Sequence, residues 1–189
     1  NEVEANSLRI AGIGGGHLGE AMVVVGNLLI DFDYRLMSNV WNVPDQSFRN
    51  LALETMEERV ATLNILGCNY SLESLESYLA EAFVESLERP FHESNLHREE
   101  IKDGRNKAIE LSSLEFLSLH KTLNEVKPMK FLKISADVFI HHISFKLEDR
   151  KSDVSLRVEN GIITDLKTDC PRKKYIRSLL IGTPLSEWK

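Results

Sequence analysis

Five of the ten glycines in this 189-residue chain lie between Gly12 and Gly19. Glycine lets the backbone adopt φ > 0 and approach another group closely, so this segment is predicted to be a loop. The N–H groups of such a loop can cradle a phosphate. A flexible connection within a hairpin explains the same composition equally well. His17, inside the segment, is interpreted either as a nucleotide contact or as a solvated loop histidine.

The other histidines have no spacing that defines a metal site. His141 and His142 are adjacent on a predicted strand, so their rings point to opposite faces and cannot share one metal ion. His92 and His97 are five residues apart in a polar segment with glutamates nearby, but this spacing gives no defined ligand geometry. We therefore predict no metal site.

The two cysteines, Cys68 and Cys170, are far apart and lack CxxC spacing. Neither a zinc site nor a disulfide framework is indicated, and neither cysteine has a context that matches a nucleophile. Because structural disulfides belong to oxidising compartments, a reducing, cytoplasmic location is expected.

Charge and hydropathy exclude two classes of partner. The formal net charge is −6, and the basic residues gather only locally at Arg172-Lys173-Lys174 and Arg177, which we interpret as a solvated helix face. Nucleic-acid binding needs a larger cluster of Lys and Arg, so no nucleic-acid partner is expected. The longest apolar run, Ala21–Ile30, is far shorter than the roughly 20 residues that span a bilayer. No membrane segment is expected.

Hydrophobic periodicity and turn residues predict the elements that must position these groups. The apolar, β-branched run Ala21–Phe32 is typical of a central strand that is covered on both faces. The predicted elements of the first half are a hairpin over Val3–Ala5 and Leu8–Ile10 with a turn at Asn6-Ser7, the strand Ala21–Phe32, a short helix from Asp33 through Trp41, a partly helical stretch over Phe48–Leu63, and a long amphipathic helix capped by Ser71 that ends at Leu87.

In the second half the period changes from helical to alternating after Pro128. Residues 90–107 are polar and predict a linker. The elements expected after it are a helix over Ala108–Asn124, strands over Phe131–Asp137, Val138–Leu147, Val154–Val158 and Ile162–Leu166 with a two-residue turn at Asn160-Gly161, and a helix over Tyr175–Ile181 that ends at Gly182. This order of elements predicts an α+β fold.

Several segments match the pattern of a known family. Asn1 through Gly12 resembles a segment that runs Asn-Asp-Val, a short turn and Lys-Ile-Ser-Gly, with Arg9-Ile10-Ala11-Gly12 in the last position. Val25–Tyr34 resembles the strand that follows it, and Glu57–Leu63 is similar to an Arg-Val-Thr-x-Leu element. On these residues the chain resembles the second half of lipoate-protein ligase A, especially archaeal versions.

This resemblance implies part of a biotin/lipoate ligase-like mixed sheet with helices in residues 1–89, a linker in 90–107, and an accessory C-terminal α+β domain in 108–189 with a small antiparallel sheet and a helix. It also implies an activity: ATP with Mg²⁺ activates lipoate to lipoyl-adenylate, and the acyl group passes to a lysine of a carrier domain. No tightly bound cofactor is expected. The implied partners are the lipoyl carrier domains of 2-oxoacid dehydrogenase complexes or the glycine cleavage carrier protein.

The resemblance also implies the site residues. Arg9 takes the place of the family's catalytic lysine, beside the adenylate phosphate and the acyl carboxylate, while Gly12, Gly14, Gly16 and Gly26 let the backbone approach the ligand. Arginine keeps the positive charge and can grip phosphate bidentately, but its planar fork differs from an ammonium in reach and hydration. We therefore expect a chain that binds adenylate and catalyses poorly.

Two further departures from the family leave alternatives open. First, the family's Arg-x-Ser-Gly-Gly-Gly segment is missing, because Gly14–Gly16 comes after Arg9 and is not preceded by Arg and Ser. Second, Val23–Gly26 lacks the histidine that bacterial relatives often carry there. The missing segment is expected from an N-terminal half or from a second ligase subunit. The alternative is a non-catalytic subunit or pseudoenzyme that binds a ligase partner or a lipoyl domain. A biotinyl or octanoyl transferase relative is a third interpretation.

Overall fold

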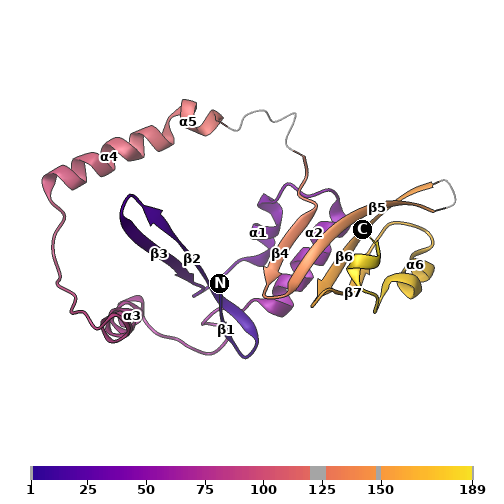
Figure 1. The fold of residues 1–189 in the computed structure, drawn as a ribbon, viewed down its shortest axis with the longest axis horizontal. Helices are drawn as coiled ribbons and strands as arrows, with labels where there is room; N and C mark the ends of the chain where they lie inside the picture. The colour runs from indigo at the N-terminus through magenta and orange to yellow at the C-terminus, as the bar shows by residue number, and fades with distance from the viewer. Residues whose placement is uncertain (1, 120–126, 148–149, 189) are drawn as a thin grey trace. The chain divides into compact units, whose positions relative to one another are not determined.

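The computed structural model describes residues 2–119, 127–147 and 150–188, and it confirms the α+β class, with helices and two antiparallel sheets (Figure 1). The chain divides into two compact units: unit 1 is Asn1–Asn69 together with Pro128–Lys189, and unit 2 is Tyr70–Lys127. This division does not follow the boundaries expected at residues 89 and 107. The reason is that the strands after Pro128 pack on a helix from the first part of the chain.

The first sheet of unit 1 has the strand order β1-β2-β3. Its strands are β1 (Glu2–Ala5), β2 (Leu8–Leu18) and β3 (Ala21–Leu28), all antiparallel. The predicted turn at Asn6 and Ser7 is confirmed, and both residues take left-handed φ values of 53° and 62°.

The glycine-rich segment is a strand, so the loop predicted over Gly12–Gly19 is wrong. From Gly12 onward β2 pairs residue by residue with β3, whose Val23–Val25 run has high strand propensity. The ladder of backbone hydrogen bonds does not need side chains on β2, and the chain turns only at its end, where Gly19 has φ 62°. The prediction of a covered central strand is also wrong, because β3 is an edge strand with exposed side chains.

Two capped helices follow the first sheet. Asp33 caps α1 (Tyr34–Val40) by accepting a hydrogen bond from the Leu36 N–H at 2.9 Å, which confirms the predicted helix. The stretch expected to be partly helical is α2 (Gln46–Arg59), whose cap is Asp45. The Asp45 carboxylate accepts from the Phe48 N–H at 2.7 Å.

The second sheet of unit 1 confirms the alternating pattern after Pro128. Its order is β4-β5-β6-β7, all antiparallel. The turn predicted at Asn160-Gly161 is present, with φ 51° and 81°. The elements are β4 (Phe131–Ser135), β5 (Val138–Leu147), β6 (Arg150–Glu159), β7 (Ile162–Lys167), α6 (Lys173–Leu180) and a 3₁₀ turn over Leu185–Trp188.

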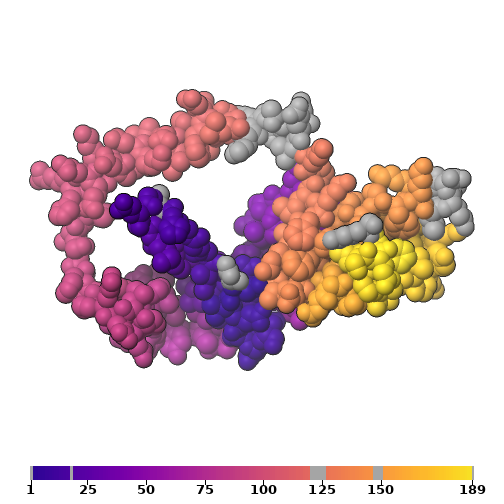
Figure 2. All heavy atoms as spheres, in the orientation of Figure 1, coloured from indigo at the N-terminus to yellow at the C-terminus, as the bar shows by residue number. Residues whose placement is uncertain are grey.

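The core of unit 1 lies on both faces of this second sheet. On one face α2 packs against β4 and β5, and on the other α6 packs against β6 and β7; Figure 2 shows α6 and the C-terminal turn in yellow against the orange strands. The α2 cluster is Phe48, Leu51, Ala52, Met56, Val60, Ile134, Val138 and Ile140. The α6 cluster is Val154, Leu156, Val158, Ile163, Leu166, Ile176, Leu180 and Leu185.

Unit 2 contains α3 (Leu72–Leu87), α4 (Arg98–Ser112) and α5 (Leu114–Ser118). Ser71 caps α3 as predicted, accepting from the Ser74 N–H at 3.2 Å. No residue of these three helices is buried. The linker predicted over 90–107 is helical from Arg98, and residues 120–124 of the helix predicted over Ala108–Asn124 lie outside the described residues.

Candidate functional site

The backbone of Arg9 is fixed from two sides in unit 1. On β2 it pairs with Glu4 of β1. On its other side it forms a parallel bridge with Val60, and its carbonyl accepts a hydrogen bond from the Ala61 N–H at 2.9 Å. The segment that follows α2 therefore positions Arg9 relative to the core.

A one-residue irregularity in β2 decides where the Arg9 side chain points. Glu4 pairs with Arg9 while Val3 pairs with Ala11, so Ile10 is an extra residue without a partner on β1. Such a bulge shifts the alternation of side chains. Arg9 consequently shares a face of the sheet with Gly12, which pairs with Glu2 on one side and with Asn27 on the other.

The guanidinium of Arg9 lies in the space that Gly12 leaves empty. A Cβ at Gly12 would lie 2.9 Å from Arg9 Nη2 and 3.2 Å from Asn27 Oδ1. Arg9 Nη1 donates to the Ile134 carbonyl at 3.0 Å, and the Gly12 N–H donates to Asn27 Oδ1 at 2.8 Å. A larger residue at position 12 would displace the guanidinium, so the glycine is required for close approach.

A second cation reaches the same place from the second sheet. Lys133 of β4 lies with Nζ 3.3 Å from Glu2 Oε1, and Arg9 Nε lies 3.5 Å from Glu2 Oε2. The Glu2 side chain is 7% exposed, whereas Arg9 and Lys133 are 32% and 47% exposed. Two partly exposed cations thus converge on one buried carboxylate, an arrangement that can bind an anion.

The structure brings together only some of the predicted site residues. Gly26 lies beside Gly12, since its added Cβ would be 3.4 Å from the Gly12 carbonyl oxygen. Gly14 and Gly16 lie farther along the hairpin, where they pair with Val25 and Val23. At about 3.3 Å per strand residue, Gly16 is roughly 13 Å from Gly12. Arg9 and Gly12 therefore form one group on the same face of the sheet. Gly26 pairs with Ile13 and belongs to the opposite face, and Gly14 and Gly16 lie farther along the hairpin.

Sequence reasoning missed Glu2, Asn27 and Lys133 as members of this group. Asn27 had a signal, because it is a polar residue within an apolar strand and pairs directly with Gly12. Glu2 lay in the segment Asn1–Gly12, but nothing in its spacing indicated burial. Lys133 gave no signal, because it is 124 positions from Arg9 and only the fold brings the two together.

A second polar cluster lies where α2 begins. The side chain of His142 on β5 is 6% exposed, with Nδ1 3.5 Å from Asp45 Oδ2 and Nε2 3.9 Å from Asp153 Oδ1. The Ser144 hydroxyl donates to Asp153, which lowers the pKa of that carboxyl against the opposing effect of burial, and Lys151 and His142 add to the lowering. His141 faces the other way and packs edge-on against Phe131, in agreement with the predicted opposite directions of the two rings.

Cys170 is a free thiol beside Ser152. The Ser152 hydroxyl donates to its sulfur at 3.6 Å, and this bond, together with a backbone hydrogen bond from Arg172, lowers the pKa of the thiol. The ring nitrogens of His142 lie beside Asp45 and Asp153, and Cys170 is hydrogen-bonded to Ser152, so these two side chains do not form a cysteine–histidine pair. Nothing therefore assigns Cys170 a nucleophilic role.

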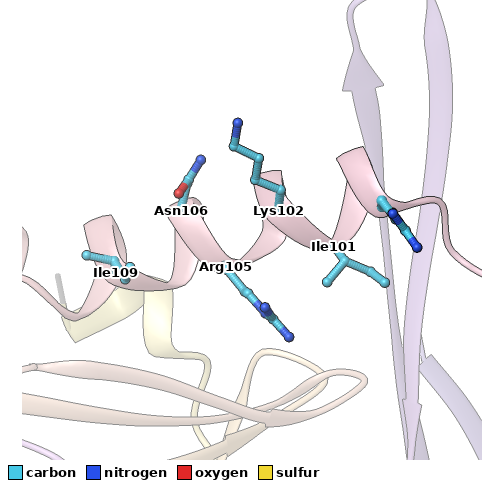
Figure 3. A pocket seen from close by; sticks show the side chains of 6 residues that line it. Ile101, Lys102, Arg105, Asn106 and Ile109 are labelled. Atoms are coloured by element: carbon cyan, nitrogen blue, oxygen red, sulfur yellow. The ribbon is translucent and has the colours of Figure 1, made fainter.

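A shallow hollow on α4 of unit 2 is lined by one helix only. Figure 3 shows Lys102 and Asn106 on one side of that helix and Ile101 and Arg105 on the other. In the part of the chain that the structure describes, every residue that lines the hollow belongs to α4, and their side chains diverge from the helix. This hollow is not a site that could orient a ligand.

No protein-family model matches the chain, and no curated protein matches it. Among the described residues, no three His, Cys, Asp or Glu side chains lie together as a metal site would require. In the same residues, no helix has the length and apolar character needed to cross a bilayer.

Proposed function

We propose that this chain is a lipoate-protein ligase A-like protein that acts in protein lipoylation, together with an N-terminal half or a partner chain. In this reaction ATP with Mg²⁺ activates lipoate to lipoyl-adenylate, and the lipoyl group then passes to a lysine of a lipoyl carrier domain. The observation that carries the proposal is the Arg9 guanidinium, held beside the side-chain-free Gly12 and still one-third exposed. The resemblance of Arg9-Ile10-Ala11-Gly12 to Lys-Ile-Ser-Gly supports it.

Arg9 would contact the adenylate phosphate or the acyl carboxylate. A fixed cation in a partly desolvated place stabilises negative charge that develops during acyl transfer, because little reorganisation is needed. Gly12 and Gly26 would let the backbone approach the adenylate. The free thiols Cys68 and Cys170 fit the cytoplasmic location that this proposal carries.

The proposal is tested by incubating the chain with ATP, lipoate and an unmodified lipoyl domain, with and without the N-terminal half of a ligase. Mass spectrometry of the carrier domain should detect the lipoyl adduct when both halves are present. Arg9→Lys should increase the rate of transfer and Arg9→Met should abolish it, while Arg89→Lys in unit 2 serves as the control. A carrier domain that never gains mass in any mixture would exclude the ligase.

One observation favours the alternative, a non-catalytic subunit that binds a ligase partner. The free edge of β3 exposes Met22, Val24 and Val25, with exposed fractions of 76%, 67% and 62%. An uncovered edge strand with apolar side chains is suited to pairing with a strand of another chain. Val24→Lys should then abolish co-purification with a ligase half, whereas Arg9→Lys should leave co-purification unchanged and yield no lipoyl transfer.

A further inference from the structure

The Glu2 carboxylate is buried without hydrogen bonds. Neither of its oxygens accepts a hydrogen bond from the residues that the structure describes, although both oxygens are inaccessible to solvent. Buried carboxylates ordinarily accept hydrogen bonds, because desolvation without them is costly. What holds Glu2 in place is charge: Arg9 Nε at 3.5 Å and Lys133 Nζ at 3.3 Å.

The two cations exceed the one anion that they surround. Within these ion pairs Glu2 supplies a single negative charge, whereas Arg9 and Lys133 supply two positive charges. Both cations also keep part of their surface in solvent. A ligand with more negative charge and more acceptor oxygens than a carboxylate would satisfy this pair better.

The contacts of Glu2 are long for a built ion pair. Charge-assisted N–H···O hydrogen bonds lie near 2.7–2.9 Å. Both contacts of Glu2 are longer than that, while Arg9 uses its Nη1 for the Ile134 carbonyl. The carboxylate therefore occupies the space between the cations without completing their hydrogen bonding.

We propose that Arg9 and Lys133 together form a binding site for a phosphate group, and that Glu2 is an internal anion that fills this site until the ligand displaces it. The chemical class is the phosphate of a nucleoside monophosphate or an acyl-adenylate. The identity of that ligand rests on the proposed function, whereas the two-cation geometry does not. Lys133 is a binding residue that belongs to the second sheet, so the site requires both sheets of unit 1.

Glu2 competes with the ligand in this arrangement. An internal carboxylate reduces the fraction of molecules whose site is free, and the apparent affinity falls by that fraction. Removing its charge should therefore strengthen phosphate binding. Removing either cation should weaken phosphate binding, because the charge-assisted contact that this cation makes to the phosphate is lost.

The test is titration of the full chain with adenosine 5′-monophosphate, followed by isothermal calorimetry. Glu2→Gln should lower Kd about tenfold, and Lys133→Met should raise it about tenfold, which corresponds to about 1.4 kcal/mol in each direction. Glu20→Gln in the turn between β2 and β3 is the control for the loss of a carboxylate, and Lys130→Met is the control before β4. The increase in Tm with added ligand gives a second readout, and Lys133→Arg should restore binding.

The inference is overturned if no variant binds the nucleotide, or if Glu2→Gln and Lys133→Met leave Kd within twofold of the parent. The lipoylation assay separates this failure from failure of the proposed function. Lipoyl transfer with unchanged nucleotide affinity would reject the two-cation site and keep the ligase. The predicted shifts in affinity without any lipoyl transfer would keep the site and reject the ligase.

Discussion

Gly12 is the residue on which the position of the Arg9 guanidinium depends. We expect Gly12→Ala to push the guanidinium away from Glu2, since the new Cβ would lie 2.9 Å from Nη2. The obstacle is the end of a flexible side chain, so the loss of unfolding free energy should stay near 1 kcal/mol. The Arg9 Nε–Hε signal in the NMR spectrum should shift, and urea unfolding gives the stability.

Gly16→Ala is the control for this change. No heavy atom lies within 4 Å of a Cβ at Gly16. Alanine has less conformational freedom to lose than glycine in a strand, so this variant should be as stable as the parent or slightly more stable. Equal effects at both glycines would show that close packing at Gly12 does not matter.

The pKa of Asp153 gives a prediction about pH. Because the Ser144 hydroxyl lowers this pKa, the folded state holds the proton more weakly than the unfolded state, whose Asp titrates near 3.9. The resulting stabilisation is present above that value and is lost as pH falls through the folded pKa. Ser144→Ala should raise the pKa of Asp153 in an NMR titration and weaken the loss of stability in acid.

Ser178→Ala is a suitable comparison for Ser144→Ala. Ser178 donates only to the carbonyl of Tyr175 within α6, away from Asp153. Its removal should leave the Asp153 titration unchanged. A pKa that stays constant in Ser144→Ala would contradict the assignment of the hydroxyl as the main cause.

At the level of single residues, the sequence predicted Arg9 and Gly12 but not their neighbours. A motif read along the chain can identify residues that are three positions apart. It cannot identify Lys133, whose place depends on the pairing of β4 with β5 and on the contact of both sheets with α2. The sequence did not identify Glu2 either, because the burial of its side chain follows from tertiary packing.

At the level of elements, the N-cap of α2 offers a test that separates two roles of Asp45. One carboxylate oxygen accepts from the Phe48 N–H, and the other lies 3.5 Å from His142. Asp45→Ala should lower the unfolding free energy by about 1 kcal/mol through loss of the cap. Asp45→Asn keeps a capping oxygen, so it should lose less in the same urea titration.

If the two substitutions cost the same, the cap is not what Asp45 contributes. The result would then point to its charge beside His142. A loss in neither variant would mean that packing of α2 on the sheet, through residues such as Phe48 and Leu51, holds the helix start without help from the side chain.

Caps and turns were the elements that the sequence predicted best. Asp33, Ser71 and Asn160-Gly161 each act through local chemistry, so a short window contains the information. The glycine-rich strand was missed because its conformation depends on β3, which supplies hydrogen bonds across the sheet. The edge position of β3 was missed for a related reason. An apolar run predicts that its side chains are buried, but the run alone does not show which element, if any, covers them.

At the level of the whole molecule, the two units should differ in stability. Unit 1 contains both buried clusters, whereas α3, α4 and α5 of unit 2 have no buried residue. Amide hydrogens in these helices should therefore exchange far faster than those of β5 and β6. Hydrogen–deuterium exchange with mass spectrometry measures this difference.

Two results would bear on that expectation. Slow exchange in α3 when the chain is alone would contradict it. Protection that appears only after addition of a ligase half would instead show that the exposed apolar residues of α3, among them Leu79 and Phe83, become covered in an assembly.

The unpaired Ile10 in β2 has a consequence for how relatives of this chain should be sought. Deleting that one amino acid would leave a regular strand in which the arginine still pairs with Glu4 and shares the face of Gly12, now at an offset of two. An offset of three places the two residues on one face only when a bulge accompanies it. A chain with the same four letters and no bulge would hold its arginine on the opposite face of the sheet.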